Sequence, residues 1–219
     1  MILGMDTATA ATAAAVWAPG GPQVEARDDP APGERPGNAT RLLALVEEVL
    51  ELAGGWSQVE RIAVGIGPGG FTGLRHGIAT ARALAQGRGL PLAGVSSLRA
   101  LALGAEARPG TPVYAVIDAR RGEVFAAAWR DDGPLLEPVA IAPDRLARSL
   151  PPGALAVGDG AVRFREQLER AGVAVPVDRS AAHRVSALNV CRLGAEGGAA
   201  DRDTLVPDYR REPDASPRS

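Results

Sequence analysis

The stretch GIGPGGFTGLRHGIATARALAQGRG, residues 65–89, decides the fold. The run Arg61–Ile66 leads into it and predicts a buried strand. The turn that follows is rich in Gly and Pro and precedes an alanine-rich helix, with Thr72 as the predicted N-cap and Gly87 as the predicted end. The sequence therefore predicts a strand, a tight turn and a helix whose N-terminal amides form a candidate anion site.

Three interpretations of this turn compete. The spacing of Gly65, Gly67 and Gly70 fits the dinucleotide-binding fingerprint, but the next predicted strand, Leu90–Val95, is not closed by a carboxylate. A Walker A phosphate loop needs a lysine after its last glycine, and the chain contains no lysine. Each nucleotide motif thus fails at a specific residue. The structural alternative is a Gly/Pro turn that lets a helix pack closely on its strand.

Longer motifs point to a family. The string GPGGFTGLRHG, with MDT at residues 5–7 and IDARRGEVF at residues 117–125, resembles TsaB proteins, the non-catalytic partners in bacterial threonylcarbamoyladenosine synthesis on tRNA. LVPDYRR at residues 205–211 resembles a C-terminal motif of the same family, and the resemblance covers nearly the whole chain. Gly70 and Asn38 depart from it, because the family commonly has Ser and His at these positions.

The predicted elements repeat one order twice: a three-stranded meander, then alternating helices and strands. The expected strands are 2–6, 12–18, 23–27, 61–66, 90–95, 112–118, 123–130, 135–141 and 154–157, and the expected helices are 38–53, 72–87, 97–106, 144–150, 162–171 and 183–196. This order and the resemblance imply an α/β protein with two actin-like (RNase H-like) βββαβα domains facing across a cleft. The expected domains are 1–106, which carries the partner-binding helices, a smaller 107–200, and a partly disordered tail, 201–219.

Composition narrows the possible functions. The 219 residues carry 24 arginines against 26 acidic residues, for a net charge of −2, whereas a protein that binds nucleic acid alone usually has a basic excess. The single cysteine, Cys191, is expected as a small buried hydrophobe, and with two histidines it gives no zinc-ligand spacing. A signal peptide and an apolar membrane span are both missing from the sequence, so a cytoplasmic location is expected.

The cleft is predicted to be a degenerate version of a nucleotide site. In the alignment of the two halves, Asp6 matches Asp118, each at the end of a first strand that enters a hairpin. The first hairpin turn lacks glycine, and the second places two arginines where phosphates need room, although these arginines can also clamp an anion. We therefore assign no catalytic residue and no metal ligand. The residues of the degenerate cleft are Asp6, Thr7, Asp118, Arg120, Arg121, Gly158 and Gly160.

The helix predicted at 38–53 carries a wide apolar surface. Its leucines and valines spread over about 180°, whereas a helix that faces one core needs roughly 100°. Either a partner subunit covers the excess apolar surface, or this helix and the one predicted at 72–87 cover each other. The family resemblance favours the partner subunit. The expected interface residues are Leu42, Leu45, Val46, Val49, Leu74, Arg75, Ile78 and Arg82.

The resemblance implies a partner subunit that binds and activates the TsaD-like catalytic subunit, which transfers threonylcarbamoyl to an adenosine of tRNA next to the anticodon. It also implies a TsaE-like ATPase as a further partner, a homodimer when the chain is alone, and only indirect contact with tRNA. No cofactor is expected in this chain, and ATP and metal are expected in the partner subunits. The alternative is an active ATP-dependent phosphotransferase or ATPase that uses the same cleft. A peptidase has no supporting motif.

Overall fold

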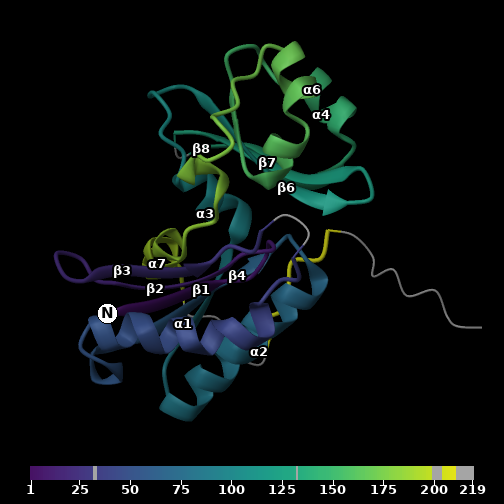
Figure 1. Ribbon diagram of the computed structural model, residues 1–219. Helices are drawn as coiled ribbons and strands as arrows, with labels where there is room; N and C mark the ends of the chain where they lie inside the picture. Colours follow the sequence, from purple (N-terminus) through teal and green to yellow (C-terminus); the bar gives the residue numbers. More distant parts are fainter. Residues whose placement is uncertain (32–33, 132, 199–203, 211–219) are drawn as a thin grey trace, which may run out of the picture.

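The computed structural model describes residues 1–31, 34–131, 133–198 and 204–210. It contains two β-sheets, one above the other in Figure 1, each covered by helices. The first sheet has the strand order β3-β2-β1-β4-β5 and the second has the order β8-β7-β6-β9. The α/β class and the duplicated actin-like plan are confirmed.

The first sheet begins with an antiparallel meander and continues with parallel strands. The middle strand β1 pairs antiparallel with β2 and parallel with β4. Because both faces are covered, the central strands are apolar throughout rather than alternating. The strands are β1 (Ile2–Asp6), β2 (Thr12–Trp17), β3 (Gln23–Asp28), β4 (Arg61–Gly67) and β5 (Leu92–Ser96).

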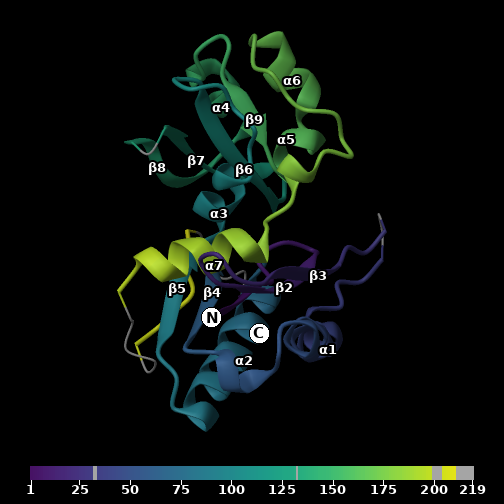
Figure 2. The same ribbon diagram turned by 90° about the vertical axis from the view of Figure 1, so that its left-hand side faces the viewer.

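Two long helices cover one face of the first sheet. These are α1 (Asn38–Leu52), which packs on β2 and β3, and α2 (Phe71–Arg88), which packs on β4. A short 3-10 helix, η1 (Trp56–Gln58), lies between α1 and β4 in the chain. The other face carries α7 (Ala187–Glu196), which lies across the sheet in Figure 2.

The second sheet repeats the meander with β6 (Pro112–Arg120), β7 (Glu123–Arg130) and β8 (Gly133–Ile141), and adds β9 (Leu155–Val157) parallel to β6. A single parallel bridge between Leu155 and Ala174 lies where the first sheet has its fifth strand. The helices of this unit are α4 (Pro143–Ser149), α5 (Asp159–Arg163) and α6 (Arg165–Arg170), with the 3-10 helix η2 (Ala181–His183) leading out of it.

Two helices join the sheets. α3 (Ser97–Leu103) packs on β6 and β7 of the second sheet and on α7, so that it lies between the two units in Figure 2. One apolar cluster runs through α3 from the first sheet to the second, with Leu98 and Leu101 at its centre. The chain returns to the first sheet through Ser186, where the Glu25 carboxylate of β3 accepts hydrogen bonds from the Ser186 hydroxyl and the Ala187 amide. A carboxylate at this point satisfies the first free amide of α7.

Several predicted boundaries are wrong. Thr72 is not an N-cap: α2 begins at Phe71 after Gly70, without a side-chain cap. By contrast, α1 begins at Asn38 as predicted, and the Asn38 side chain is buried and accepts a hydrogen bond from the Thr12 hydroxyl. The helix predicted at 162–171 is divided at Phe164, and the one at 183–196 starts as η2 and becomes regular only at Ala187.

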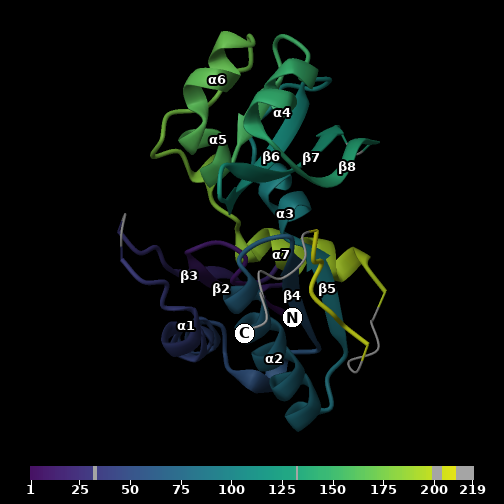
Figure 3. The ribbon, with the colours of Figure 1, turned by 90° about the vertical axis from the view of Figure 1, so that its right-hand side faces the viewer.

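The predicted domain limits stay predictions. The contacts of α7 are with the first sheet, although its residues fall in the range 107–200. Within the predicted tail, residues 204–210 run beside β5 in Figure 3, and the Leu205 side chain is buried. The expected disorder of the tail concerns mainly 201–203 and 211–219, which lie outside the described residues.

Candidate functional site

The glycines of the central motif let α2 lie directly against the end of β1. A Cβ on Gly69 would lie 2.2 Å from the Ala8 carbonyl oxygen, and one on Gly73 would lie 2.2 Å from that of Thr7. The Gly70 amide donates to the Ala8 oxygen at 2.7 Å, and the Thr7 hydroxyl donates to the Gly73 oxygen at 2.8 Å. The turn therefore allows α2 to pack against β1. The Gly70 amide belongs to the predicted anion site, but it already donates its hydrogen bond to the Ala8 carbonyl oxygen.

Asp6 is sealed inside the first unit. Its residue is 2 % exposed, and its carboxylate accepts hydrogen bonds from the Ser97 hydroxyl at 2.6 Å and the Ala8 amide at 2.9 Å. A Cβ on Gly65 would lie 1.8 Å from the Asp6 carboxylate, so glycine is required there. Burial raises the pKa of Asp6, and the Ser97 and Ala8 bonds oppose that rise. Asp6 does not face the cleft.

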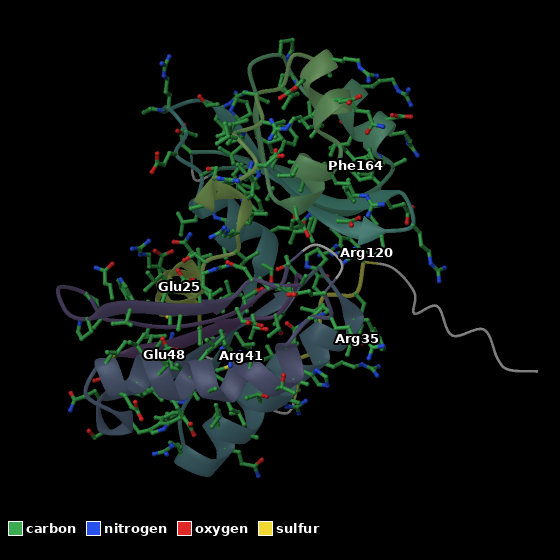
Figure 4. The ribbon with its side chains drawn as sticks, viewed as in Figure 1. Glu25, Arg35, Arg41, Glu48, Arg120 and Phe164 are labelled. Atoms are coloured by element: carbon green, nitrogen blue, oxygen red, sulfur yellow. The ribbon has the colours of Figure 1, made fainter. Side chains whose placement is uncertain are left out.

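The cleft lies between the two units and has a volume of about 1100 Å³. Its lower wall comes from the β1–β2 turn, the residues before α1 and the first turns of α2, and its upper wall comes from the β6–β7 turn. Residues 208–210 of the C-terminal segment complete the lining. Arg35 and Arg120 in Figure 4 mark the lower and upper walls on the same side of the molecule.

The carboxylates of the upper wall accept hydrogen bonds from other groups of the chain. The Asp118 carboxylate accepts from the Arg163 guanidinium at 2.7 Å and from the Arg120 amide at 2.9 Å. Asp159 accepts from the Asp118 amide at 3.0 Å, and burial raises its pKa. Arg120 and Arg121 both have positive φ, 64° and 52°, at the tip of the β6–β7 hairpin.

The lower wall carries an aromatic cluster. The rings of Phe71 and Tyr209 have centroids 5.3 Å apart, and the Arg75 guanidinium lies 3.8 Å from the Phe71 centroid. The Arg75 Nε also donates to the Tyr209 hydroxyl at 3.1 Å. The Asp208 amide donates to the Ile66 carbonyl at 2.8 Å, which fixes the C-terminal segment beside this cluster.

The structure brings together only part of the predicted cleft. Asp118, Arg120 and Arg121 line it, while Asp6 and Thr7 are buried elsewhere in the first unit. Gly158 and Gly160 are buried against the backbone of β6.

Sequence reasoning missed Arg35, Arg75 as a cleft residue, Asp159 and Tyr209. Tyr209 belongs to the LVPDYRR motif, so that motif was a usable signal; Arg35 had none, because its loop position depends on the fold.

The predicted interface stays a prediction, although the monomer buries six of its eight residues. The side chains of Leu42, Leu45, Val46, Val49, Leu74 and Ile78 are all buried, the first five in full and Ile78 at 4 % exposure. They pack against the sheet, so the wide apolar arc of α1 is used within the monomer and leaves these atoms unable to touch a partner. Arg75 is exposed and Arg82 half-buried. The outer faces of the helices instead expose Leu43 and Leu52 on α1 and the alanines Ala79 and Ala83 on α2.

Ser96, Cys191 and His183 have structural partners. Ser96 caps α3 by accepting from the Arg99 amide, and Cys191 is buried against the backbone of Ile2 and Ala15, where burial raises its pKa. His183 accepts from the Gly158 amide through Nδ1 at 3.0 Å. Among the residues the structure describes, no three His, Cys, Asp or Glu side chains gather as a metal site, and no helix is long and apolar enough to cross a membrane.

Comparison with known proteins agrees with this architecture. Residues 38–187 match the family model described as TsaD, tRNA N6-adenosine threonylcarbamoyltransferase. The tRNA threonylcarbamoyladenosine biosynthesis protein TsaB of Bacillus subtilis is 31% identical over 163 residues, which are 70% of each chain. The chain belongs to the TsaB family.

Two further comparisons support the TsaB assignment. The Escherichia coli TsaB protein is 42% identical over 133 residues, 60% of this chain and 55% of the relative, so the match spans about half of that protein. A Pseudomonas aeruginosa structure, described as an uncharacterized protein with similarity to peptidase YeaZ, superposes with a TM-score of 0.77 at 28% identity. That superposition covers 96% of this chain and 99% of the other.

Proposed function

We propose that this chain is a non-catalytic subunit in the synthesis of threonylcarbamoyladenosine on tRNA, and that it binds and activates a TsaD-like catalytic subunit. Its TsaB relatives are named for that pathway. The observation that carries the non-catalytic part is the sealing of Asp6: a carboxylate 2 % exposed and bonded to Ser97 is unable to hold a metal ion in the cleft. ATP and metal are then bound by the partner subunits. The proposal also includes a TsaE-like ATPase as a further partner and a homodimer when the chain is alone.

The partner surface in this proposal is the outer face of α2. Ala79 and Ala83 are exposed one turn apart, and Gly87 continues the same row of small residues. Small side chains in a row let a second helix approach closely, and the exposed Leu52 of α1, at 69 % exposure, lies on the neighbouring helix. This surface replaces the buried residues that the sequence pattern suggested.

Mixing the chain with the TsaD homologue of the same organism tests the proposal. Light scattering after size exclusion should show a stable mixed complex for the natural chain and none for the Ala79→Arg/Ala83→Arg variant. An exposed alanine on α7, Ala195, provides the matched control, and Ala195→Arg should assemble normally. Circular dichroism should be unchanged in both variants. Association of the α2 variant at natural strength would contradict the surface, and a natural chain that never associates would contradict the partner.

The alternative, an active ATP-dependent phosphotransferase or ATPase, has weaker support. Asp118 and Asp159 do face the cleft, but Arg163 and Arg120 already bond the Asp118 carboxylate. Calorimetric titration of the chain with Mg-ATP distinguishes the two. Micromolar binding would favour the phosphotransferase, and an absence of heat at millimolar nucleotide would remove it.

A further inference from the structure

The cleft lining is positively charged in a chain whose net charge is −2. Five arginines line it against three aspartates, one of which, Asp118, is bonded by Arg163 from outside the lining. A second, Asp208, pairs with Arg210 at 2.7 Å. Arg120 also lies 3.5 Å from the Asp118 carboxylate. A concave surface whose guanidinium groups outnumber its carboxylates attracts anionic ligands. The arginines are Arg35, Arg75, Arg120, Arg121 and Arg210.

The charges come from both units and stand on opposite walls. Arg35 precedes α1 and Arg75 projects from α2, and no carboxylate among the described residues pairs with either guanidinium. Arg120 and Arg121 come from the β6–β7 turn on the upper wall and are both exposed. Figure 4 shows Arg35 and Arg120 on the same side of the molecule. An extended anion that runs across the mouth of the cleft would meet both pairs.

The backbone of the upper wall is unfavourable for arginine. Arg120 and Arg121 take φ values of 64° and 52°, in the left-handed region that Gly and Asn occupy at much lower cost. Gly122, the next residue, has φ 80° and fits without strain. Unfavourable backbone geometry concentrates where a side chain serves a function. Two successive arginines in this conformation therefore indicate that their guanidinium groups are needed at the tip.

The lower wall supplies aromatic surface beside these charges. Phe71 is 37 % exposed and Tyr209 is 41 % exposed, and the Arg75 guanidinium lies over the Phe71 ring. Exposed aromatic rings next to arginines are the usual means of binding single-stranded nucleic acid, because bases stack on the rings while the arginines contact phosphates. The cleft is less suited to a free nucleotide with its metal ion, because Asp6 is buried and the Gly70 amide already donates its hydrogen bond to the Ala8 carbonyl oxygen.

We propose that the mouth of this cleft binds an unpaired segment of RNA directly. Arg35, Arg120 and Arg121 contact its phosphates, and the Phe71–Tyr209 pair stacks on a base. The proposal rests on the proposed function, which makes tRNA the substrate of the assembly, and it replaces the expectation of only indirect contact with tRNA.

Fluorescence anisotropy of the full chain with a labelled RNA hairpin that has an unpaired loop tests the proposal. The Arg120→Asn/Arg121→Asn variant removes both charges with a residue that tolerates positive φ, so the turn is preserved. Its affinity should fall about tenfold or more, and the slope of log K against log salt should decrease by about 1 to 2. The control variant Arg145→Gln/Arg148→Gln, on the exposed side of α4 outside the lining, should change affinity less than about twofold.

Tyr209 gives an independent readout. Tyr209→Ala should weaken RNA binding about fivefold or more, and Tyr209→Phe should restore it, because stacking needs the ring and not the hydroxyl. Three results would overturn the proposal: no RNA binding by the natural chain at low salt, equal loss in the α4 control, or displacement of the RNA by micromolar ATP. Assembly with the TsaD homologue is measured in parallel. RNA binding without assembly would count against the proposed partner, and assembly without RNA binding would count against this cleft.

Discussion

Asp6 shows how one carboxylate is held in an apolar interior. Burial raises its folded-state pKa above the ordinary 3.8, although the hydrogen bonds from Ser97 and Ala8 lower it in part. The folded chain therefore binds the Asp6 proton more tightly than the unfolded chain does. The resulting contribution to stability is fully present below the ordinary pKa and is lost as pH rises through the raised folded value. Asp159 has a pKa shifted in the same direction, also by burial.

We expect Asp6→Asn to flatten this pH dependence, because asparagine carries no charge that folding must bury. Urea unfolding of the natural chain and the variant between pH ~4 and ~8 measures the effect. The free energy of unfolding of the natural chain should fall with rising pH relative to the variant. Asp159→Asn is the control that removes the second shifted group. A difference between natural chain and variant that stays constant over the whole range would contradict the role given to burial.

The position of α2 against β1 also depends on a glycine within the helix itself, which the sequence analysis did not single out. A Cβ on Gly77 would lie 2.3 Å from the Thr7 hydroxyl, which already donates to Gly73. Gly87, on the same helix, has nothing within 4 Å of its Cβ position. Substituting each glycine therefore distinguishes the effect of close packing, at Gly77, from the effect of helix propensity, at Gly87.

Gly77→Ala should destabilise the chain by about 1–3 kcal/mol, because the added methyl overpacks the contact with Thr7. Gly87→Ala should stabilise it by about 0.5–1 kcal/mol, because alanine is the better helix former at an exposed position. Urea unfolding of both variants gives the comparison. Equal effects of the same sign would mean that α2 does not approach β1 as closely as described.

The same helices show what the sequence reveals and what it does not. The glycine spacing and the apolar runs predict β4, the turn and α2, because these depend on neighbours in the chain. The arc of Leu42, Leu45 and Val49 also appears in the sequence, but its partner does not: only the fold shows that β2 and β3 cover it. Arg35 and Tyr209 meet in one cleft although 174 positions separate them, and no local pattern encodes that meeting.

The two sheets are joined by one apolar cluster, and this decides how the whole molecule unfolds. Leu101 of α3 is 1 % exposed and belongs to the cluster that contains Val95 of the first sheet and Ile117 of the second. Leu146, equally buried, belongs instead to a cluster confined to the second unit. Since the shared cluster must open when either unit unfolds, we expect one cooperative heat-absorption peak for the natural chain.

Leu101→Ala and Leu146→Ala each remove the same atoms from a buried site, and each should cost about 2–5 kcal/mol. Their effects on cooperativity should differ. Leu101→Ala weakens the junction itself, so differential scanning calorimetry should show the peak broadening or dividing into two. Leu146→Ala leaves the junction intact, so its single peak should move to lower temperature without dividing. If the natural chain already melts in two steps, the shared cluster does not couple the unfolding of the two units. The cleft between the units then opens and closes without a constraint from that cluster.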